Sequence, residues 1–191
     1  SASSGVPVKV YAIEKNPNAY VLLQRHNIET WGGRVTVVKT DMRAWKGPTQ
    51  PDGTFGKVDI LVSELLGSFA DNELSPECLD GVQHVLNPTH GISIPSSYTA
   101  HFTPIATPKM QHFNLEAPLT PNVQTAWEFT HPLPPSVLAR SSLRKGGSAV
   151  GGGGGFSGGD GANEHNLRYC KIAFPIQEPG VCHGLGAYFE T

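Results

Sequence analysis

The sequence has 191 residues, which suffices for one large domain or two small ones with a sizeable core. Its formal net charge of -2 argues against a nucleic-acid binder that depends on phosphate contacts. The 3 cysteines are odd in number and lack CxxC spacing, so the sequence predicts neither a disulfide framework nor a zinc site. Because it has no apolar run of membrane-spanning length and its start does not resemble a signal peptide, we expect a soluble intracellular protein.

A strand followed by a helix opens the ordered part of the sequence. Residues 8–13, VKVYAI, predict the strand, and Asn16-Pro17 is typical of the cap and first residue of a helix over residues 18–27. Glu14 ends the strand just before this helix. A carboxylate at such a position suits both hydroxyls of a ribose, because its oxygens accept hydrogen bonds from each. Taken alone, this pattern fits nicotinamide-dependent dehydrogenases as well as S-adenosylmethionine (AdoMet) folds.

The next predicted strand covers residues 34–40, RVTVVKT, and it delivers Asp41 and Met42 at its carboxyl end. On residue type alone, Asp41 is as suited to capping a turn as to binding a ligand. For Met42, residue type alone favours filling of the core, since a thioether is apolar and flexible. A loop rich in proline and glycine follows over residues 46–56.

Two glutamates flank the following loop. The β-branched run over residues 58–62 predicts a strand buried on both faces, with Glu64 at its carboxyl end. Glu73 follows a stretch of turn-forming residues. Ser75 is typical of a helix cap and Pro76 of a first helical position, so we expect a helix from there to about Leu86.

A pair of carboxylates on one short loop suits a guanidinium group. The guanidinium is planar and always charged, and its N–H groups form a fork that carboxylates hold with charge-assisted hydrogen bonds. The residues alone also allow a simpler interpretation, in which Glu64 is a strand-end charge and Glu73 is a solvated loop residue.

Longer strings around these residues decide between the two interpretations. SELLGSFADNELSPECLDG, residues 63–81, resembles the double-glutamate loop of protein arginine methyltransferases of the symmetric-dimethylating type. VYAIEKNPNA, residues 10–19, resembles the segment that follows the glycine-rich loop in that family. DMRAW, residues 41–45, is similar to the family's DMREW-like stretch, from which it departs at Ala44.

The resemblance implies roles for particular residues. Glu64 and Glu73 would both clamp the guanidinium of an arginine substrate. Glu14 would bind the ribose of AdoMet, Asp41 would accept a hydrogen bond from the adenine amino group, and Met42 would lie against the adenine ring. AdoMet is then the expected cofactor, and no metal is expected because the histidines are scattered without ligand spacing.

The second half of the sequence has a different pattern. Apolar and polar residues alternate over four stretches, which predicts an antiparallel β domain: residues 92–107, 125–131, 168–176 and 181–191. We therefore expect an α/β, Rossmann-like AdoMet-binding domain over residues 1–90 and part of an antiparallel β-barrel over 91–191. A glycine-rich stretch at about 140–166 is typical of a flexible insertion.

The resemblance covers only part of the family's catalytic region. No GxGxG-type loop precedes Val8, so the first strand and glycine loop of the Rossmann-like domain are expected to be absent. The sequence is thus interpreted as a fragment with little or no activity alone. The resemblance implies a homo-oligomeric parent of cytoplasm and nucleus that docks a WD-repeat partner through a region absent here. Its expected substrates are arginine-glycine-rich segments of histones and of spliceosomal Sm-type proteins, with no nucleic acid or membrane as direct partner.

Two other classes remain open. One is a non-catalytic, methyltransferase-like interaction scaffold, favoured by the missing glycine loop and disfavoured by the intact pair of glutamates. The other is a nicotinamide-dependent oxidoreductase, because Glu14 alone would serve either cofactor. No hydride-transfer site can be identified in the sequence, which makes the oxidoreductase the more distant of the two.

Overall fold

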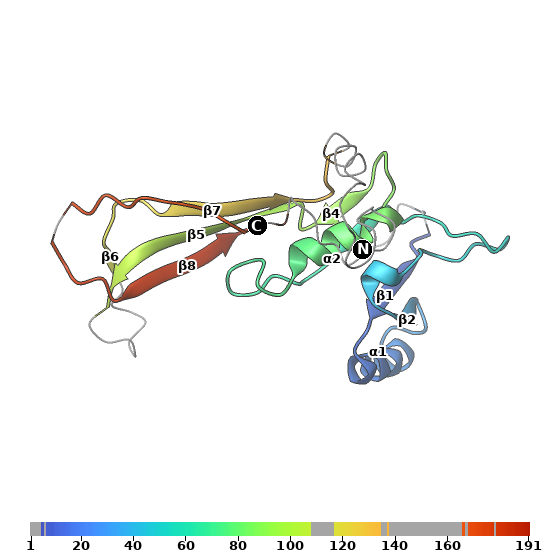
Figure 1. The fold of residues 1–191 in the computed structure, drawn as a ribbon. Coiled ribbons are helices and arrows are strands. Elements are labelled where there is room, and N and C mark those ends of the chain that lie inside the picture. The colour runs from blue at the N-terminus through green and yellow to red at the C-terminus, as the bar shows by residue number, and fades with distance from the viewer. Residues whose placement is uncertain are drawn as a thin grey trace, which may run out of the picture.

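The computed structural model describes residues 5, 7–107, 117–134, 137, 166, 168–177 and 179–191. In chain order its elements are β1 (Val10–Glu14), α1 (Pro17–Glu29), β2 (Val35–Lys39), η1 (Met42–Ala44), β3 (Ile60–Val62), α2 (Ser75–Val82), η2 (Gln83–Val85), β4 (Ile92–Ile94), β5 (Ser97–Ala106), β6 (Ala117–Pro118), β7 (Gln124–Thr130) and β8 (Gly184–Glu190). Figure 1 shows α2 between the unit formed by β1, α1 and β2 and the long strands β5, β7 and β8.

The predicted strand–helix–strand unit at the start of the chain is confirmed. β1 and β2 are parallel and pair from Val10 opposite Val35 to Glu14 opposite Lys39. The side chain of Asn16 caps α1 by accepting hydrogen bonds from the amides of Asn18 at 2.9 Å and Ala19 at 3.3 Å. This is one repeating unit of the predicted α/β domain.

The central strand differs from its prediction. β3 covers only Ile60–Val62, and it pairs in parallel with β4 rather than with β1 or β2. The prediction that this strand is buried on both faces is wrong, since Ile60 is 57% and Val62 is 73% exposed. Among the described residues β4 is the only strand beside β3, and β-branched residues specify a strand without specifying what covers it. Residues 92–94 were expected in the antiparallel region and instead complete this parallel pair.

Helix α2 begins differently from its prediction. Leu74 occupies the N-cap in the left-handed conformation with φ of 64°, and Ser75 and Pro76 are its first helical residues, without a side-chain cap. The Leu74 amide donates to the carbonyl of Asp71 at 3.0 Å, so the preceding turn, and not a serine hydroxyl, starts the helix. α2 ends at Val82, and the short helix η2 continues the chain toward Leu86.

The second half forms an antiparallel sheet centred on β5. One edge of β5 pairs with β7 and β6, and the other pairs with β8 from Thr99 opposite Glu190 to Ile105 opposite Gly184. The antiparallel prediction is confirmed, but the described residues form no closed barrel. The glycine-rich insertion predicted at about 140–166 lies outside the described residues, apart from Asn166.

Residues 168–176 do not form the predicted strand. They show the expected alternation of half-buried and exposed residues as far as Phe174, and its ring lies 5.4 Å from that of Phe102 in β5. No backbone ladder accompanies this alternation among the described residues. A side-chain pattern of period 2 therefore indicated an extended chain beside the sheet, not a strand within it.

The core lies where α2 meets the antiparallel sheet. Ala70, Leu79, Tyr98 and Phe129 are buried together, and Leu61, Leu66, Trp127 and Phe189 pack around them. Full burial of a leucine or phenylalanine side chain contributes about 1.5–3 kcal/mol, so this cluster fixes the loop that precedes α2. No helix in the described part of the chain is long and apolar enough to cross a membrane.

Candidate active site

The segment that runs from the end of β3 into the first turn of α2, called the acidic loop here, covers residues 64–77 and carries four acidic side chains, Glu64, Asp71, Glu73 and Glu77. Glu64 lies two residues after the end of β3, next to Ser63, whose amide donates to the carbonyl of Ile94 in β4 at 2.8 Å. Glu64 and Glu73 are both exposed, and neither carboxylate has a hydrogen bond or an ion pair within the described residues.

A tight turn separates the two glutamates. Gly67 and Ala70 exchange two backbone hydrogen bonds of 3.1 Å, and Ala70 adopts a positive φ of 63°. The side chain of Asn72 closes the turn by accepting from the amide of Phe69 at 2.9 Å. Glu64 and Glu73 each stand three residues outside the Gly67–Ala70 bridge, one on either limb of the turn.

Gly67 is required by the close approach of Asn72. A Cβ atom at Gly67 would lie 2.4 Å from the Asn72 Oδ1 atom, closer than real contacts allow. The turn-forming residues that the sequence places between the glutamates therefore have a defined use: they fold the loop back, with one glutamate on each limb of the turn.

The other two carboxylates of the acidic loop face the antiparallel sheet. Asp71 accepts a hydrogen bond from the Trp127 Nε1 atom at 3.0 Å and one from the Arg168 Nε atom at 2.6 Å. Both terminal nitrogens of Arg168 donate to the carboxylate of Glu77, one of them at 2.9 Å. The hydrogen bonds to Glu77, and then those to Asp71, raise the pKa of Arg168 above its ordinary value against the opposing effect of burial.

These contacts are not predictable from local sequence. Asp71 follows the pattern of a turn residue, Glu77 of a first helical turn, and Arg168 of a strand residue. Arg168 lies 97 positions from Asp71, and no spacing rule connects them. The structure thus adds a second carboxylate pair, with its own guanidinium, to the pair that the sequence identifies.

Glu14 and Asp41, the residues predicted to bind ribose and adenine, lie at the carboxyl ends of β1 and β2, called the cofactor edge below. Glu14 is the last residue of β1, and its carbonyl accepts from the amide of Thr40, next to Asp41, at 3.1 Å. One Glu14 carboxylate oxygen accepts from the amide of Asn16 at 2.6 Å. The other has no partner in the described part of the chain, so it is available to a hydroxyl donor.

Asp41 has an ion pair that we did not predict. The Nε atom of Arg43 donates to its Oδ1 at 3.0 Å and the Nη2 atom to its Oδ2 at 2.9 Å. These side-chain hydrogen bonds are the main reason that the pKa of Asp41 falls from 3.8 to about 2. Oδ1 also accepts from the Arg43 amide at 2.9 Å, so a ligand would have to use the remaining lone pair of Oδ2. The Asp-x-Arg spacing is the sequence signal that could have indicated this pair.

Arg43 also connects the predicted cofactor edge to α2. A Cβ atom at Gly81 would lie 2.6 Å from the Cγ atom of Arg43, so the arginine stem packs directly on the α2 backbone. Met42, the predicted adenine contact, is half-buried at the start of η1. The helix that follows the acidic loop and the strand end that carries Asp41 are therefore in contact through one side chain.

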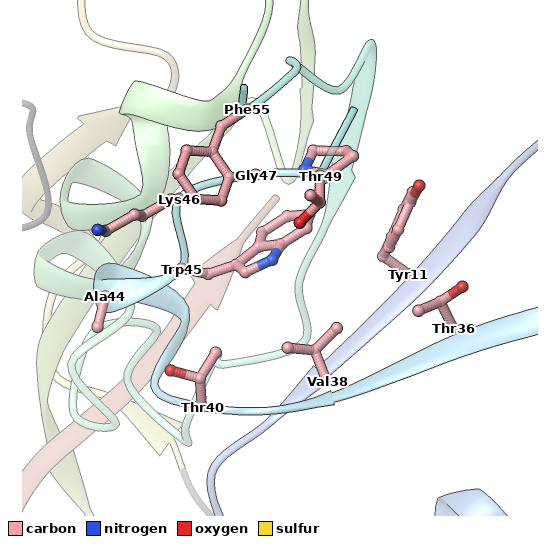
Figure 2. Close-up of a pocket in the computed structure, with 11 residues that line it drawn as sticks. Tyr11, Thr36, Val38, Thr40, Ala44, Trp45, Lys46, Gly47, Thr49 and Phe55 are labelled. Atoms are coloured by element: carbon pink, nitrogen blue, oxygen red, sulfur yellow. The ribbon is translucent and has the colours of Figure 1, made fainter. Parts of the chain in front are cut away.

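A cavity of about 540 Å³ lies elsewhere, between the β1–β2 pair and the loop that follows η1. Figure 2 shows Trp45 among Val38 and Tyr11 from the strands and Phe55 and Thr49 from the loop. The rings of Tyr11 and Trp45 are 5.6 Å apart. None of the five site residues predicted from sequence lines this cavity, and in the described part of the chain no group of His, Cys, Asp and Glu could hold a metal ion.

Comparison with known proteins identifies the class to which these features belong. The chain is 40% identical over 211 residues to protein arginine N-methyltransferase skb1 of Schizosaccharomyces pombe, covering 99% of this chain and 29% of that protein. It is 38% identical over 197 residues to protein arginine N-methyltransferase 5 of Xenopus laevis, covering 96% of this chain and 27% of that protein. The relatives are arginine methyltransferases, and the chain spans less than a third of their length.

The first half of the chain matches a known protein family. Residues 1–94 match the family described as PRMT5 arginine-N-methyltransferase. Among solved structures, a Trypanosoma brucei "PRMT1 enzyme-prozyme heterotetrameric complex with AdoHcy" is similar with a TM-score of 0.48 and 14% identity, over 68% of this chain and 48% of that one. The chain belongs to the PRMT5 family of protein arginine methyltransferases.

Proposed function

We propose that this chain is part of a longer protein, called the parent protein below, which transfers methyl groups from AdoMet to arginine side chains of proteins. The products are ω-N-monomethylarginine and symmetric dimethylarginine. The observation that carries the proposal is the pair of exposed carboxylates of Glu64 and Glu73 on the two limbs of one tight turn, both without a partner among the described residues.

The unpaired state of these glutamates matters because a guanidinium needs free acceptors. Each carboxylate has two oxygens, and the described residues occupy none of them. Two carboxylates hold the planar fork with charge-assisted hydrogen bonds, and they balance the positive charge that remains on the methylated product. They also hold one terminal nitrogen in a fixed direction, and orientation together with electrostatics supplies most of the catalysis of such a transfer.

The residues at the β1–β2 edge fit AdoMet in their donor and acceptor chemistry. Glu14 offers a free carboxylate oxygen to the ribose hydroxyls, and Asp41 offers the remaining lone pair of its Oδ2 atom to the adenine amino group. Met42 supplies an apolar, polarizable surface beside them. When bound there, AdoMet would supply a methyl group carried on a positively charged sulfur.

The proposed substrates and setting rest on the resemblance of the acidic loop and on the names of the relatives. They are arginine-glycine-rich segments of histones and spliceosomal Sm-type proteins, methylated in cytoplasm and nucleus by a homo-oligomeric parent protein with a WD-repeat partner. A tight turn that carries two exposed carboxylates suits such segments, because glycines beside an arginine let the backbone approach the loop closely.

The test is a methylation assay of the parent protein with AdoMet and an arginine-glycine-rich peptide, with the product isomer determined by mass spectrometry. Symmetric dimethylarginine that disappears in Glu64→Gln and in Glu73→Gln supports the proposal. Glu128→Gln is the matched control, since Glu128 is an exposed carboxylate of β7. A folded parent protein that binds AdoMet and methylates no arginine would establish the interaction scaffold instead.

A further inference from the structure

Arg168 is the basic counterpart of the acidic loop within the protein itself. Its guanidinium reaches Asp71 through Nε and Glu77 through both terminal nitrogens, and one terminal nitrogen also donates to the carbonyl of Asn166 at 2.8 Å. Four of the five N–H donors of the guanidinium are thus used on two carboxylates and one carbonyl. A lysine at this position could not make the same set of bonds, because it lacks the planar fork.

The contact is more enclosed than a surface ion pair. The side chain of Arg168 is 23% exposed, while those of Asp71 and Glu77 are 8% and 14% exposed. The guanidinium carbon lies 5.5 Å from the centre of the Phe129 ring, within the buried core. Trp127 adds a neutral donor to Asp71, and its indole meets the Phe69 ring edge-on at 5.4 Å. The cluster therefore attaches the acidic loop to β7.

The bonds to Arg168 act on the limb that carries Glu73. Asp71 precedes Glu73 by two positions, and its carbonyl accepts the amide of Leu74, which starts α2. Glu77 lies in the first turn of that helix. Arg168 thus holds the chain on both sides of Glu73, although it does not contact Glu73 itself.

The charges of the acidic loop divide in the same way. Arg168 forms ion pairs with both Asp71 and Glu77, whereas Glu64 and Glu73 have no cation among the described residues. Without an internal guanidinium, the loop would offer a second carboxylate pair to an incoming arginine. Occupation of that pair restricts substrate binding to the outer carboxylates.

We propose that Arg168 is a positioning residue for arginine methylation: it fixes the acidic loop through Asp71 and Glu77 and keeps that pair closed to substrate. The inference rests on the proposed function. Its physical basis is that a small misplacement of the groups that orient a substrate reduces turnover strongly, while the binding of a cofactor on other elements is preserved.

The test compares the parent protein with its Arg168→Lys variant. We expect kcat for the peptide to fall roughly 10- to 100-fold, while the AdoMet dissociation constant stays within about twofold. Amide exchange of Gly67, Ala70 and Leu74, measured by hydrogen–deuterium exchange, is expected to rise about tenfold. Arg25→Lys is the matched control, because the one ion pair of Arg25 among the described residues is an exposed pair with Glu29 on α1.

A second variant separates positioning from folding. Trp127→Phe keeps the aromatic packing and removes the indole donor to Asp71, so it should lower kcat in the same direction by a smaller factor. Arg168→Lys and Trp127→Phe proteins that keep normal kcat and loop protection would overturn the inference while the proposed function stands. If the unsubstituted parent protein methylates no arginine, the proposed function itself fails.

Discussion

The two sides of the acidic loop carry the same residue types in opposite environments. On the side toward the sheet, Asp71 and Glu77 are nearly buried and share the guanidinium of Arg168. On the outer side, Glu64 and Glu73 are exposed and have no partner among the described residues. The comparison teaches that partners, not residue type, assign the role of a carboxylate: one pair holds the loop and the other is free to bind a substrate.

The largest expected effect is loss of activity on the outer side without loss of stability. In the parent protein, Glu64→Gln or Glu73→Gln should lower kcat/KM for an arginine-glycine-rich peptide by roughly 10²- to 10³-fold, because each removes a charge that orients and stabilises the guanidinium. Either substitution should change the free energy of unfolding by at most about 0.5 kcal/mol, since no described contact is lost. A large loss of stability in either variant would break the comparison.

On the inner side we expect a loss of stability, which can be measured on the 191-residue chain. Arg168→Ala leaves Asp71 and Glu77 together without their cation, and we expect it to lower the free energy of unfolding by about 2–3 kcal/mol. Urea unfolding followed by circular dichroism measures this difference. Arg25→Ala, which removes an exposed pair on α1, should cost at most about 0.5 kcal/mol. Equal costs for the two variants would contradict the assigned role of Arg168.

A smaller effect is expected where α2 meets the cofactor edge. In Gly81→Ala the new Cβ atom would lie 2.6 Å from the Arg43 Cγ atom, so the arginine must move away from Asp41. We expect AdoMet affinity to fall about three- to tenfold, equivalent to roughly 1 kcal/mol. Isothermal titration of the parent protein checks this, with Arg43→Lys expected to weaken binding in the same direction. Unchanged affinity in both variants would separate Asp41 from the cofactor.

The smallest effect is the pH dependence of the Asp41–Arg43 pair. The pKa of Asp41 is lowered from 3.8 to about 2 on folding, so its contribution to stability is complete above about pH 4 and is lost as the pH falls toward 2. Because solvent screens this partly exposed pair, we expect a loss of about 1 kcal/mol. Unfolding of the 191-residue chain between pH 5 and 2 should show this loss, and Asp41→Asn should remove it. If the Asp41→Asn variant showed the same loss of stability between pH 5 and 2, the assignment of this loss to Asp41 would be contradicted.

Local patterns predicted the elements whose signals are themselves local. The cap formed by Asn16 and the apolar alternation of β1 and β2 specify the first unit, and the structure has it as expected. The ends of strands also carry Glu14, Asp41 and Glu64 as predicted. Their roles toward a cofactor and a substrate stay predictions.

Contacts between distant segments were not predictable. The strand character of Ile60 and Val62 is evident from their side chains, but their exposure depends on which strands lie beside β3. Leu74, which starts α2 in a left-handed conformation, follows from the fold of the turn before it. Arg168 looks like an ordinary member of an alternating stretch, and its role emerges only where the sheet meets the acidic loop.

The most direct test compares two carboxylates that lie two positions apart, Glu73 and Asp71. In the parent protein, Glu73→Gln and Asp71→Asn are assayed side by side for kcat/KM with an arginine-glycine-rich peptide and for the midpoint of thermal unfolding. Glu73→Gln should lower kcat/KM by roughly 10²- to 10³-fold with an unchanged midpoint, whereas Asp71→Asn should lower the midpoint by several degrees, about 2–8 °C, with a smaller loss of activity. Two variants that lose activity and stability to the same extent would contradict the division of the acidic loop into a binding side and a holding side.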